Sequence, residues 1–330
     1  MLKNKTKEEL QTTKNLLAFS AGGDSTALLF LLLENNIVFD IAIVDYGLRA
    51  QSKEEVSYAK ALAKQYGFTC NVYQAKEIEA NFEANARKIR YDFFETLIQE
   101  HNYDTLLTAH HLGDRFEWML MQFCKGAGCA ELAGMKEKTK RNDYILYRPL
   151  LHVDKQELLE YLHVKEIKYF EDESNLDEKY RRNTFRHTYT KPLLQEYLQG
   201  IKKSFEYIDA DVQDLIQDSP LKKINELVCF KKTPTSRNDI YLIDKYLKSR
   251  NHLMSGDEKK LLQEKQTAVI GRKYIVTTMS NYVCIAPYVK AKNMPKNFKE
   301  KMRLLHVEPR LRGYLATDPE AVEFLSLLLV

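Results

Sequence analysis

The segment Ser20–Ser25, with the sequence Ser-Ala-Gly-Gly-Asp-Ser, constrains the fold of this chain more than any other feature. It follows the apolar run Leu16–Phe19 and precedes the apolar run Thr26–Leu33, a pattern that predicts a buried strand, a glycine-rich turn and a helix. Such a turn directs backbone N–H groups and the positive end of a helix toward one point. The segment therefore predicts a binding site for an anion.

The type of anion site is narrowed by what the segment lacks. No Gly-Lys pair occurs in the chain, so the common phosphate loop ending in Gly-Lys-Ser/Thr is absent. An ordinary strand-to-helix turn is the alternative interpretation, and the coinciding hydroxyls and Asp24 argue against it. The segment resembles the Ser-Gly-Gly-x-Asp-Ser loop of the N-type ATP pyrophosphatases. Ala21 replaces the first glycine of that loop, and we expect alanine to be tolerated there only with a negative φ.

Composition indicates a soluble, globular, cytoplasmic protein. The chain has 330 residues, of which 44% are hydrophobic and 29% charged, and this length predicts two domains. No apolar run is long enough for a signal peptide or a membrane span, so no membrane partner is expected. The 5 cysteines form no Cys-x-x-Cys pair, which argues against a disulfide framework and against a zinc or iron–sulfur site.

Charge differs between the two halves of the chain. Residues 1–200 contain 27 Lys and Arg against 30 Asp and Glu, whereas residues 201–330 contain 23 against 16, a net charge of +7. A basic second half predicts a polyanionic partner larger than a nucleotide, with a solvated lysine-rich surface as the alternative. We place the domain boundary near residue 200, with a helical extension of the first domain from about residue 151.

Strands and helices alternate in the first half, which predicts an α/β fold with a parallel sheet and helices on both faces. The predicted strands are Leu16–Phe19, Phe39–Val44, Thr69–Tyr73 and Asp104–Thr108, and the predicted helices are Ser52–Tyr66, Ala80–Gln99 and Gly113–Cys124. Ser52 is the expected N-cap of its helix, with Glu55 completing a capping box. Ligands of such sheets bind at the carboxyl ends of the strands, where Ser20–Ser25, Asp45 and His110 are expected to meet.

The alternation stops after Leu151. Helices are predicted at Asp154–Val164 and Arg182–Leu198. From about Ser219 the pattern predicts a smaller α+β domain that contains the helix Ser255–Glu264 and the strands Lys273–Thr278 and Tyr282–Ala286.

Four further segments carry side chains suited to nucleotide or RNA chemistry. Asp45 and Arg49 follow a strand, where they could contact a ribose or metal and a phosphate. Arg87, Arg90 and Tyr91 share one helix face, which suits a phosphate backbone or a stacked base. A surface turn and a solvated basic face are the respective alternatives.

The other two segments combine carboxylates with basic or amide groups. His110, Asp114 and Glu117 have helical spacing just beyond a strand, and such carboxylates can hold Mg²⁺ or accept an ammonium group and its proton. A purely structural role is the alternative. The run Asp172–Asn175 precedes the arginine-rich segment Tyr180–His187, and these side chains can contact base edges and phosphates.

Taken in order, the five segments resemble those of the tRNA(Ile)-lysidine synthetases, a branch of the N-type ATP pyrophosphatases. That family has Ser-Gly-Gly-x-Asp-Ser, Val-Asp-His-Gly-Leu-Arg, Ala-Arg-x-x-Arg-Tyr, Ala-His-x-x-Asp-Asp-x-x-Glu, and Asp-x-Ser-Asn ahead of Arg-Asn-x-x-Arg. The resemblance covers about Leu16–Pro192 and is weaker beyond Ser219. Besides Ala21, the chain departs from it at Tyr46, which replaces His, and at Gly113, which replaces the first Asp of the Asp-Asp pair.

The resemblance implies a reaction and its participants. ATP, with Mg²⁺, adenylates O2 of the wobble cytidine in the isoleucine tRNA with a CAU anticodon, and free L-lysine then attacks C2 and expels AMP. The resemblance also allows a homodimer. A tRNA-thiolating enzyme and a non-catalytic RNA-binding protein are the alternatives; the missing Cys-x-x-Cys disfavours the first, and the intact Asp24, Ser25 and His110 disfavour the second.

It also implies roles for individual residues. The nucleotide-binding residues are Ser20, Ala21, Gly22, Gly23, Asp24, Ser25 and Asp45. The catalytic residues are Asp24, which also faces the metal, His110, Asp114 and Glu117. The residues that bind tRNA or the adenylate are Arg49, Arg87, Arg90, Asp172, Asn175, Arg182, Asn183 and Arg186.

Overall fold

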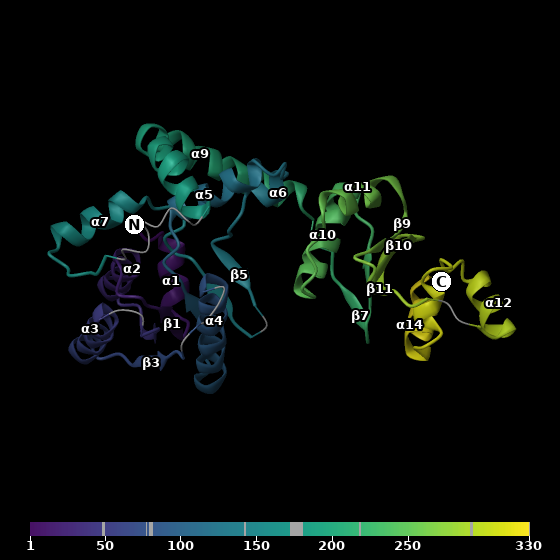
Figure 1. The fold of residues 1–330 in the computed structure, drawn as a ribbon, viewed down its shortest axis with the longest axis horizontal. Coiled ribbons are helices and arrows are strands. Elements are labelled where there is room, and N and C mark those ends of the chain that lie inside the picture. Colours follow the sequence, from purple (N-terminus) through teal and green to yellow (C-terminus); the bar gives the residue numbers. More distant parts are fainter. Residues whose placement is uncertain are drawn as a thin grey trace. The chain divides into compact units, whose positions relative to one another are not determined.

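The computed structural model describes residues 1–330 except 48–49, 77, 79–81, 142, 172–180, 218, 291–292 and 330. Of residues 50, 83, 181 and 182 it describes the backbone but not the side chains. The chain divides into two compact units, Met1–Asp209 and Ala210–Val330 (Figure 1). No helix in the described ranges is long and apolar enough to cross a membrane.

The first unit is built on a six-stranded sheet with the strand order β3-β2-β1-β4-β6-β5. All neighbouring strands are parallel except β5, which is antiparallel to β6 at one edge. The predicted α/β fold with a mostly parallel sheet is therefore confirmed. The strands are β1 (Asn15–Ala18), β2 (Phe39–Asp45), β3 (Cys70–Gln74), β4 (Thr105–Leu107), β5 (Lys138–Lys140) and β6 (Ile145–Tyr147).

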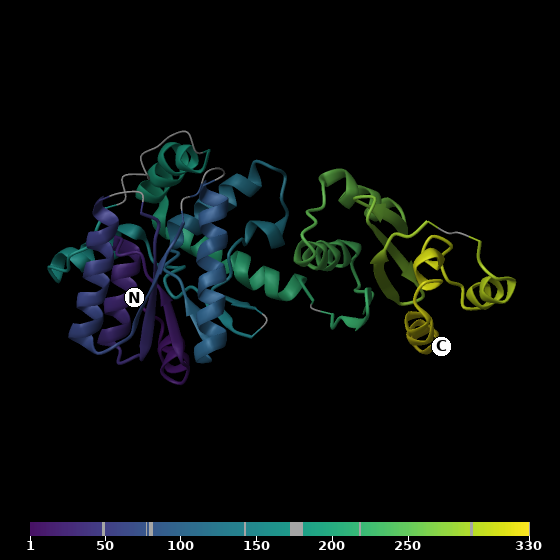
Figure 2. The same ribbon diagram turned by 60° about the horizontal axis from the view of Figure 1, so that its bottom comes forward.

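Helices cover both faces of this sheet, as Figure 2 shows. On one face, Leu17 and Ile41 pack into an apolar cluster with side chains of α2, α3 and α7. On the other face, Leu16 and Leu106 pack against Phe94 and other side chains of α4. The two faces use alternate residues of the same strands, as the strand pleat requires. The helices are α1 (Asn4–Gln11), α2 (Gly23–Glu34), α3 (Ala50–Tyr66), α4 (Phe82–His101), α5 (Leu112–Phe123), α6 (Cys129–Leu132) and α7 (Lys155–Val164).

The predicted capping box of α3 is wrong. The helix begins at Ala50, so Ser52 lies inside the first turn instead of at the N-cap. Glu55 accepts a hydrogen bond from the side-chain amide of Gln51 at 3.0 Å, four residues earlier on the helix. The same amide also donates to the carbonyl of Glu171 at 3.1 Å. A helix start can shift by two residues when other side chains satisfy its first turn.

The first unit ends in a series of helical segments: α8 (Arg181–Phe185), the π-helical turn η2 (Arg186–Thr190) and α9 (Lys191–Leu215). The α9 helix kinks at Tyr197 and continues past Gly200, so the division at Asp209/Ala210 falls inside it. The sequence predicts one helix ending at Leu198, because the π turn and the kink leave no composition signal. The division near residue 200 into a catalytic domain and a basic tRNA-binding domain stays a prediction.

The second unit contains an antiparallel sheet with the order β7-β8-β11-β10-β9. Its side chains alternate between two apolar clusters. Phe230 and Ile285 pack with α10 and α11, whereas Cys284 and Ile275 pack with α12, α13 and α14. The elements are β7 (Lys222–Ile224), β8 (Leu227–Lys231), α10 (Ser236–Ser249), α11 (Gly256–Glu264), β9 (Thr267–Ile270), β10 (Tyr274–Met279), β11 (Tyr282–Pro287), α12 (Lys296–Leu304), α13 (Arg312–Leu315) and α14 (Pro319–Leu329).

Candidate active site

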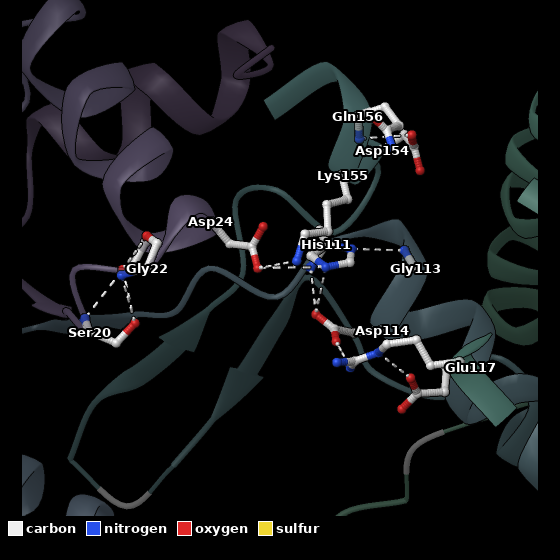
Figure 3. Close-up of polar contacts among 12 residues, drawn as sticks. Ser20, Gly22, Asp24, His111, Gly113, Asp114, Glu117, Asp154, Lys155 and Gln156 are labelled. Atoms are coloured by element: carbon white, nitrogen blue, oxygen red, sulfur yellow. Dashed lines mark hydrogen bonds and ion pairs between the residues drawn. The ribbon is translucent and has the colours of Figure 1, made fainter. Parts of the chain in front are cut away.

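The glycine-rich segment forms a closed turn between β1 and α2. The Ser20 N–H donates to Oγ of Ser25 at 3.2 Å, and that hydroxyl donates to the Gly22 carbonyl at 3.1 Å. Helix α2 begins at Gly23, and its N-cap, Gly22, provides no side-chain cap. The first N–H groups of α2 are therefore available for an anion, in the place that the sequence predicts (Figure 3).

Ala21 adopts a left-handed backbone, which contradicts the expected negative φ. Its φ is +58°, and its side chain is completely buried in the apolar core. The Ala21 carbonyl accepts a hydrogen bond from the Phe170 N–H at 3.0 Å, and Gly22 pairs with Phe170 in an isolated parallel bridge. This conformation costs an L-residue about 1–2 kcal/mol, and the backbone bond and the packing of the methyl group offset that cost.

Asp24, in the first turn of α2, lies between two basic side chains. One carboxylate oxygen, Oδ2, is 3.8 Å from Nζ of Lys155 and 3.8 Å from Nε2 of His111. The other oxygen, Oδ1, is buried and has no hydrogen-bond partner in the part of the chain that the structure describes. A buried carboxylate oxygen without a partner is costly, and a cation that arrives with a nucleotide would satisfy it. Across the residues described, no cluster of three or more His, Cys, Asp or Glu side chains could hold a metal ion.

His111 connects Asp24 to the carboxylates of α5. It is the N-cap of that helix: its Nδ1 accepts the Gly113 N–H at 3.0 Å, and its own backbone N–H donates to Asp114 at 3.1 Å. Because Nδ1 is an acceptor, the proton of the neutral ring is on Nε2. That nitrogen is 3.8 Å from Oδ2 of Asp24 and 3.6 Å from Oδ2 of Asp114. The ring is therefore oriented to donate between two carboxylates.

Sequence reasoning chose the neighbouring histidine instead. His110 has its Nδ1 2.9 Å from the hydroxyl of Thr108, and its catalytic role is still a prediction. The signal for His111 was the capping-box spacing to Asp114, three residues later.

Gly113, one of the departures from the family pattern, is required by the position of His111. A Cβ atom at residue 113 would lie 2.8 Å from Cε1 and 3.0 Å from Nδ1 of the His111 ring. The carboxylate that the family has here could therefore not be added without moving the histidine. In this chain the carboxylates of the site come from Asp24, Asp114 and Glu117.

Asp114 and Glu117 together hold a guanidinium group. Nε of Arg186 is 2.8 Å from Oε2 of Glu117, and its NH2 nitrogen is 3.2 Å from Oδ1 of Asp114. The Glu117 side chain is only 2% exposed. Two carboxylates, one of them deeply buried, thus define a site for a cation next to His111 and Asp24 (Figure 3).

The remaining predicted residues have different outcomes. Asp45 ends β2, where it accepts the Gly47 N–H at 2.8 Å. Arg87 and Arg90 are exposed on α4, with the Arg87 guanidinium 4.9 Å from the centre of the Tyr91 ring. Asn183 on α8 is buried. Outside the described residues lie Arg49, Asp172, Asn175 and the side chain of Arg182.

Tyr46, the other departure, joins the end of β2 to the start of α4. Its hydroxyl donates to the Ala86 carbonyl at 3.0 Å, and its ring packs edge-on against Phe82 with 5.7 Å between ring centres. Burial raises the pKa of Tyr46, so its hydroxyl stays protonated and continues to donate at neutral pH. The contact fixes the helix turn that carries Arg87 and Arg90.

Comparison with known proteins identifies the class of the first unit. Residues 1–193 match the PP-loop domain family. The fold of the chain also resembles that of a U34-tRNA thiolase from Methanococcus maripaludis, with a TM-score of 0.53 and 19% identity over 64% of this chain and 76% of the other. The sheet, the loop and the match define the class: the chain is a PP-loop protein, and this class binds ATP.

Relatives over the full length identify the family. The chain is 42% identical to the tRNA(Ile)-lysidine synthase of Helicobacter pylori over 313 residues, which cover 94% of this chain and 92% of the relative. It is 40% identical to that of Campylobacter jejuni over 317 residues, 96% and 97% of the two chains, and 41% identical to that of Wolinella succinogenes over 308 residues, 93% and 94%. The chain belongs to the tRNA(Ile)-lysidine synthase family.

Proposed function

We propose that this chain joins free L-lysine to C2 of the wobble cytidine in the isoleucine tRNA with a CAU anticodon, at the expense of ATP. The modified base pairs with A instead of G, and the tRNA changes its identity from methionine to isoleucine. The observation that carries the proposal is the cation site of Asp114 and Glu117, which lies one histidine away from Asp24 and the nucleotide-binding loop.

In the first half-reaction, O2 of the cytidine attacks the α-phosphorus of ATP, and pyrophosphate leaves. The N–H groups of the loop and of the first turn of α2 stabilise the charge on the phosphates. Asp24 would face the metal bound to the nucleotide, since its buried Oδ1 has no hydrogen-bond partner among the described residues. A Mg²⁺ ion bound there would neutralise negative charge on the leaving pyrophosphate.

In the second half-reaction, the ε-amine of lysine attacks C2, the C2–O2 bond breaks, and AMP leaves with that oxygen. The lysine ammonium binds at Asp114 and Glu117, where the guanidinium of Arg186 lies in this structure. One of these carboxylates accepts the proton that the ammonium must lose before it can attack. The backbone N–H of His111 donates a hydrogen bond at 3.1 Å that holds Asp114 in place, and Nε2 of the ring lies 3.6 Å from the same carboxylate oxygen.

Binding of the tRNA is divided between two regions. Arg87 and Arg90 on α4, with Arg182, Asn183 and Arg186, hold the anticodon loop, whose unpaired bases can enter a pocket. The basic residues 201–330, with their net charge of +7, bind the phosphates of the tRNA body or acceptor stem.

The proposal is tested by AMP release from ATP with a CAU-anticodon isoleucine tRNA transcript and each amino acid supplied in turn. We expect AMP only with lysine, together with a mass increase of the tRNA that corresponds to one lysyl group. A transcript with U in place of the wobble C is the matched control and should yield no AMP. AMP formation with another amino acid, or with the control transcript, would contradict the proposal.

A further inference from the structure

A lysine far from the loop in sequence contacts its carboxylate. Lys155 is the first residue of α7, and its Nζ lies 3.8 Å from Oδ2 of Asp24. The helix is capped by Asp154, whose carboxylate accepts the Gln156 N–H at 3.0 Å. The Lys155 side chain is 47% exposed, so it can turn from Asp24 toward a ligand without unfolding its helix. Figure 3 shows Lys155 directed from α7 toward Asp24 and His111.

The packing of α7 against α2 fixes this position. A Cβ atom at Gly23 would lie 3.1 Å from Cδ2 of Leu159 and 3.4 Å from a ring carbon of Tyr169, so the glycine permits a close approach of the two segments. Leu158 and Leu162 anchor α7 in the same apolar core as α2. The N-terminus of α7 is therefore held beside the loop by packing that does not depend on the ion pair.

The loop itself carries no positively charged side chain. Ser20–Ser25 offers N–H groups, two hydroxyls and one carboxylate, whereas a triphosphate brings several negative charges. In the common phosphate loop, a lysine of the loop sequence supplies the balancing charge at the β- and γ-phosphates. An ammonium group is a compact charge suited to this role, and the structure places one beside the loop.

We propose that Lys155 binds the β- and γ-phosphates of ATP and then the departing pyrophosphate. Its contact with Asp24 is the one it makes without a triphosphate. The inference rests on the proposed function, because it assumes that ATP binds at the loop in the orientation that releases pyrophosphate. An isolated ion pair of a half-exposed lysine would contribute little to stability, so a purely structural role predicts almost no effect of removing it.

The chain provides a matched control on the same helix. Lys165, at the C-terminal end of α7, forms an ion pair with Glu34 at the C-terminal end of α2, with 3.0 Å between Nζ and Oε1. It is 53% exposed, similar to Lys155. Replacing either lysine by methionine removes one α7–α2 ion pair and keeps most of the length of the unbranched side chain. Only Lys155 lies at the loop.

The experiment is calorimetric titration of the full-length chain with β,γ-imido-ATP and, separately, with AMP, both in the presence of MgCl₂. We expect Lys155→Met to weaken binding of β,γ-imido-ATP by about 10- to 100-fold and to leave AMP binding unchanged, because AMP lacks the β- and γ-phosphates. Lys155→Arg should restore most of the affinity, and Lys165→Met should bind both nucleotides like the original chain. Thermal melting of each variant verifies the fold.

Two results would overturn the inference. If Lys155→Met weakened β,γ-imido-ATP and AMP equally, the lysine would act on the loop as a whole instead of on the terminal phosphates. If it changed neither, its contact with Asp24 would be a surface ion pair. Both differ from failure of the proposed function, in which the original chain would form no lysine-dependent AMP at all.

Discussion

The two units of this chain build their sheets in opposite ways. The parallel strands of the first unit end at a common edge, where Asp24, His111 and Asp114 converge. The antiparallel sheet of the second unit is covered on both faces by apolar clusters. In a parallel sheet the carboxyl ends of the strands create a polar edge where ligands bind. When both faces of an antiparallel sheet are covered by helices, ligands can contact only the outer surface of those helices and of the loops.

Buried carboxylate oxygens in the two units differ in the groups that surround them. In the second unit, Asp239 accepts hydrogen bonds from the N–H and the hydroxyl of Thr233, both at 2.8 Å, and so closes the turn before α10. In the first unit, Glu117 is paired with Arg186 across two helical segments, and Asp24 has a buried oxygen for which the described residues provide no hydrogen-bond partner.

Asp244 of the second unit also has a buried oxygen, Oδ1, without a hydrogen-bond partner among the described residues, but its Oδ2 pairs with Lys248 at 2.7 Å and Lys259 at 3.1 Å. The unpartnered oxygen of Asp24 is distinguished by its place beside the glycine-rich loop.

The largest expected effect is at Asp24. Asp24→Asn keeps the shape of the side chain and removes its charge, so the variant should fold normally and lose about 10²- to 10³-fold in AMP formation. The measurement is the rate of AMP release with saturating ATP, tRNA and lysine, together with a thermal melt. A folded variant that forms AMP at the normal rate would contradict the catalytic role of Asp24.

The second prediction concerns the cation site of α5. Asp114→Asn and Glu117→Gln should each lower kcat/KM for lysine by about 10- to 100-fold, because each removes half of the charge that holds the ammonium. Binding of ATP should change little, since neither side chain belongs to the loop. Lysine dependence of product formation at saturating ATP and tRNA is the test. An unchanged kcat and KM in both variants would refute the assignment.

The third prediction asks whether the surface of the second unit binds RNA. Helix α12 exposes Lys296, Lys299 and Lys301, whereas its Met302 is buried. Changing the three lysines to glutamate should weaken tRNA binding about 10-fold or more. The negative slope of log affinity against log salt should also become shallower, by about 0.7 to 0.9 for each phosphate that the variant no longer binds.

The control for this prediction lies in the first unit. Charge reversal of the exposed Lys60 and Lys64 on α3 should change tRNA affinity less than the α12 variant does. Equal affinity and equal salt slope in the α12 variant and the original chain would mean that this helix is a solvated surface.

The smallest effect compares one substitution in both units. Gly113→Ala should destabilise the first unit by about 1–3 kcal/mol, because its Cβ would come within 3 Å of the buried His111 ring. Gly256→Ala, in the first turn of α11, meets nothing within 4 Å and should be neutral or stabilising by up to about 1 kcal/mol. Urea unfolding measures both. If Gly113→Ala and the original chain had equal free energies of unfolding, the His111 ring would move aside freely.

Local patterns predicted the parts of the site that depend on local structure. The strand–turn–helix pattern around Ser20–Ser25 predicted the loop, and alternation predicted that Asp45 and His110 follow strands on the same side of the sheet. Helical spacing predicted that Asp114 and Glu117 share a face, which Arg186 then joins. These inferences succeed because periods of two and 3.6 residues determine which side chains share a face.

What the sequence did not predict depends on contacts between distant segments or on atomic detail. Lys155 reaches Asp24 from 131 positions later in the chain, through packing of α7 that no local pattern encodes. The choice between His110 and His111 depends on which ring caps α5, and the left-handed φ of Ala21 depends on its bond to Phe170. In the second unit, α10 and α12 were missed although the buried apolar residues of α10, Ile240, Ile243 and Leu247, recur at helical spacing.

The π-helical turn η2 affects how this chain would respond to the deletion of one codon. Its five residues, Arg186–Thr190, accommodate one residue more than the same length of regular α-helix. Each residue of an α-helix advances the direction of its side chain by about 100°. A one-residue deletion in a regular α-helix would rotate the flanking side chains by that angle, whereas deletion of one codon from His187 to Thr190 would remove the extra residue of η2 and keep the flanking helices in register. The deletion would therefore show whether the position of Arg186 beside Asp114 and Glu117 depends on the extra residue of η2.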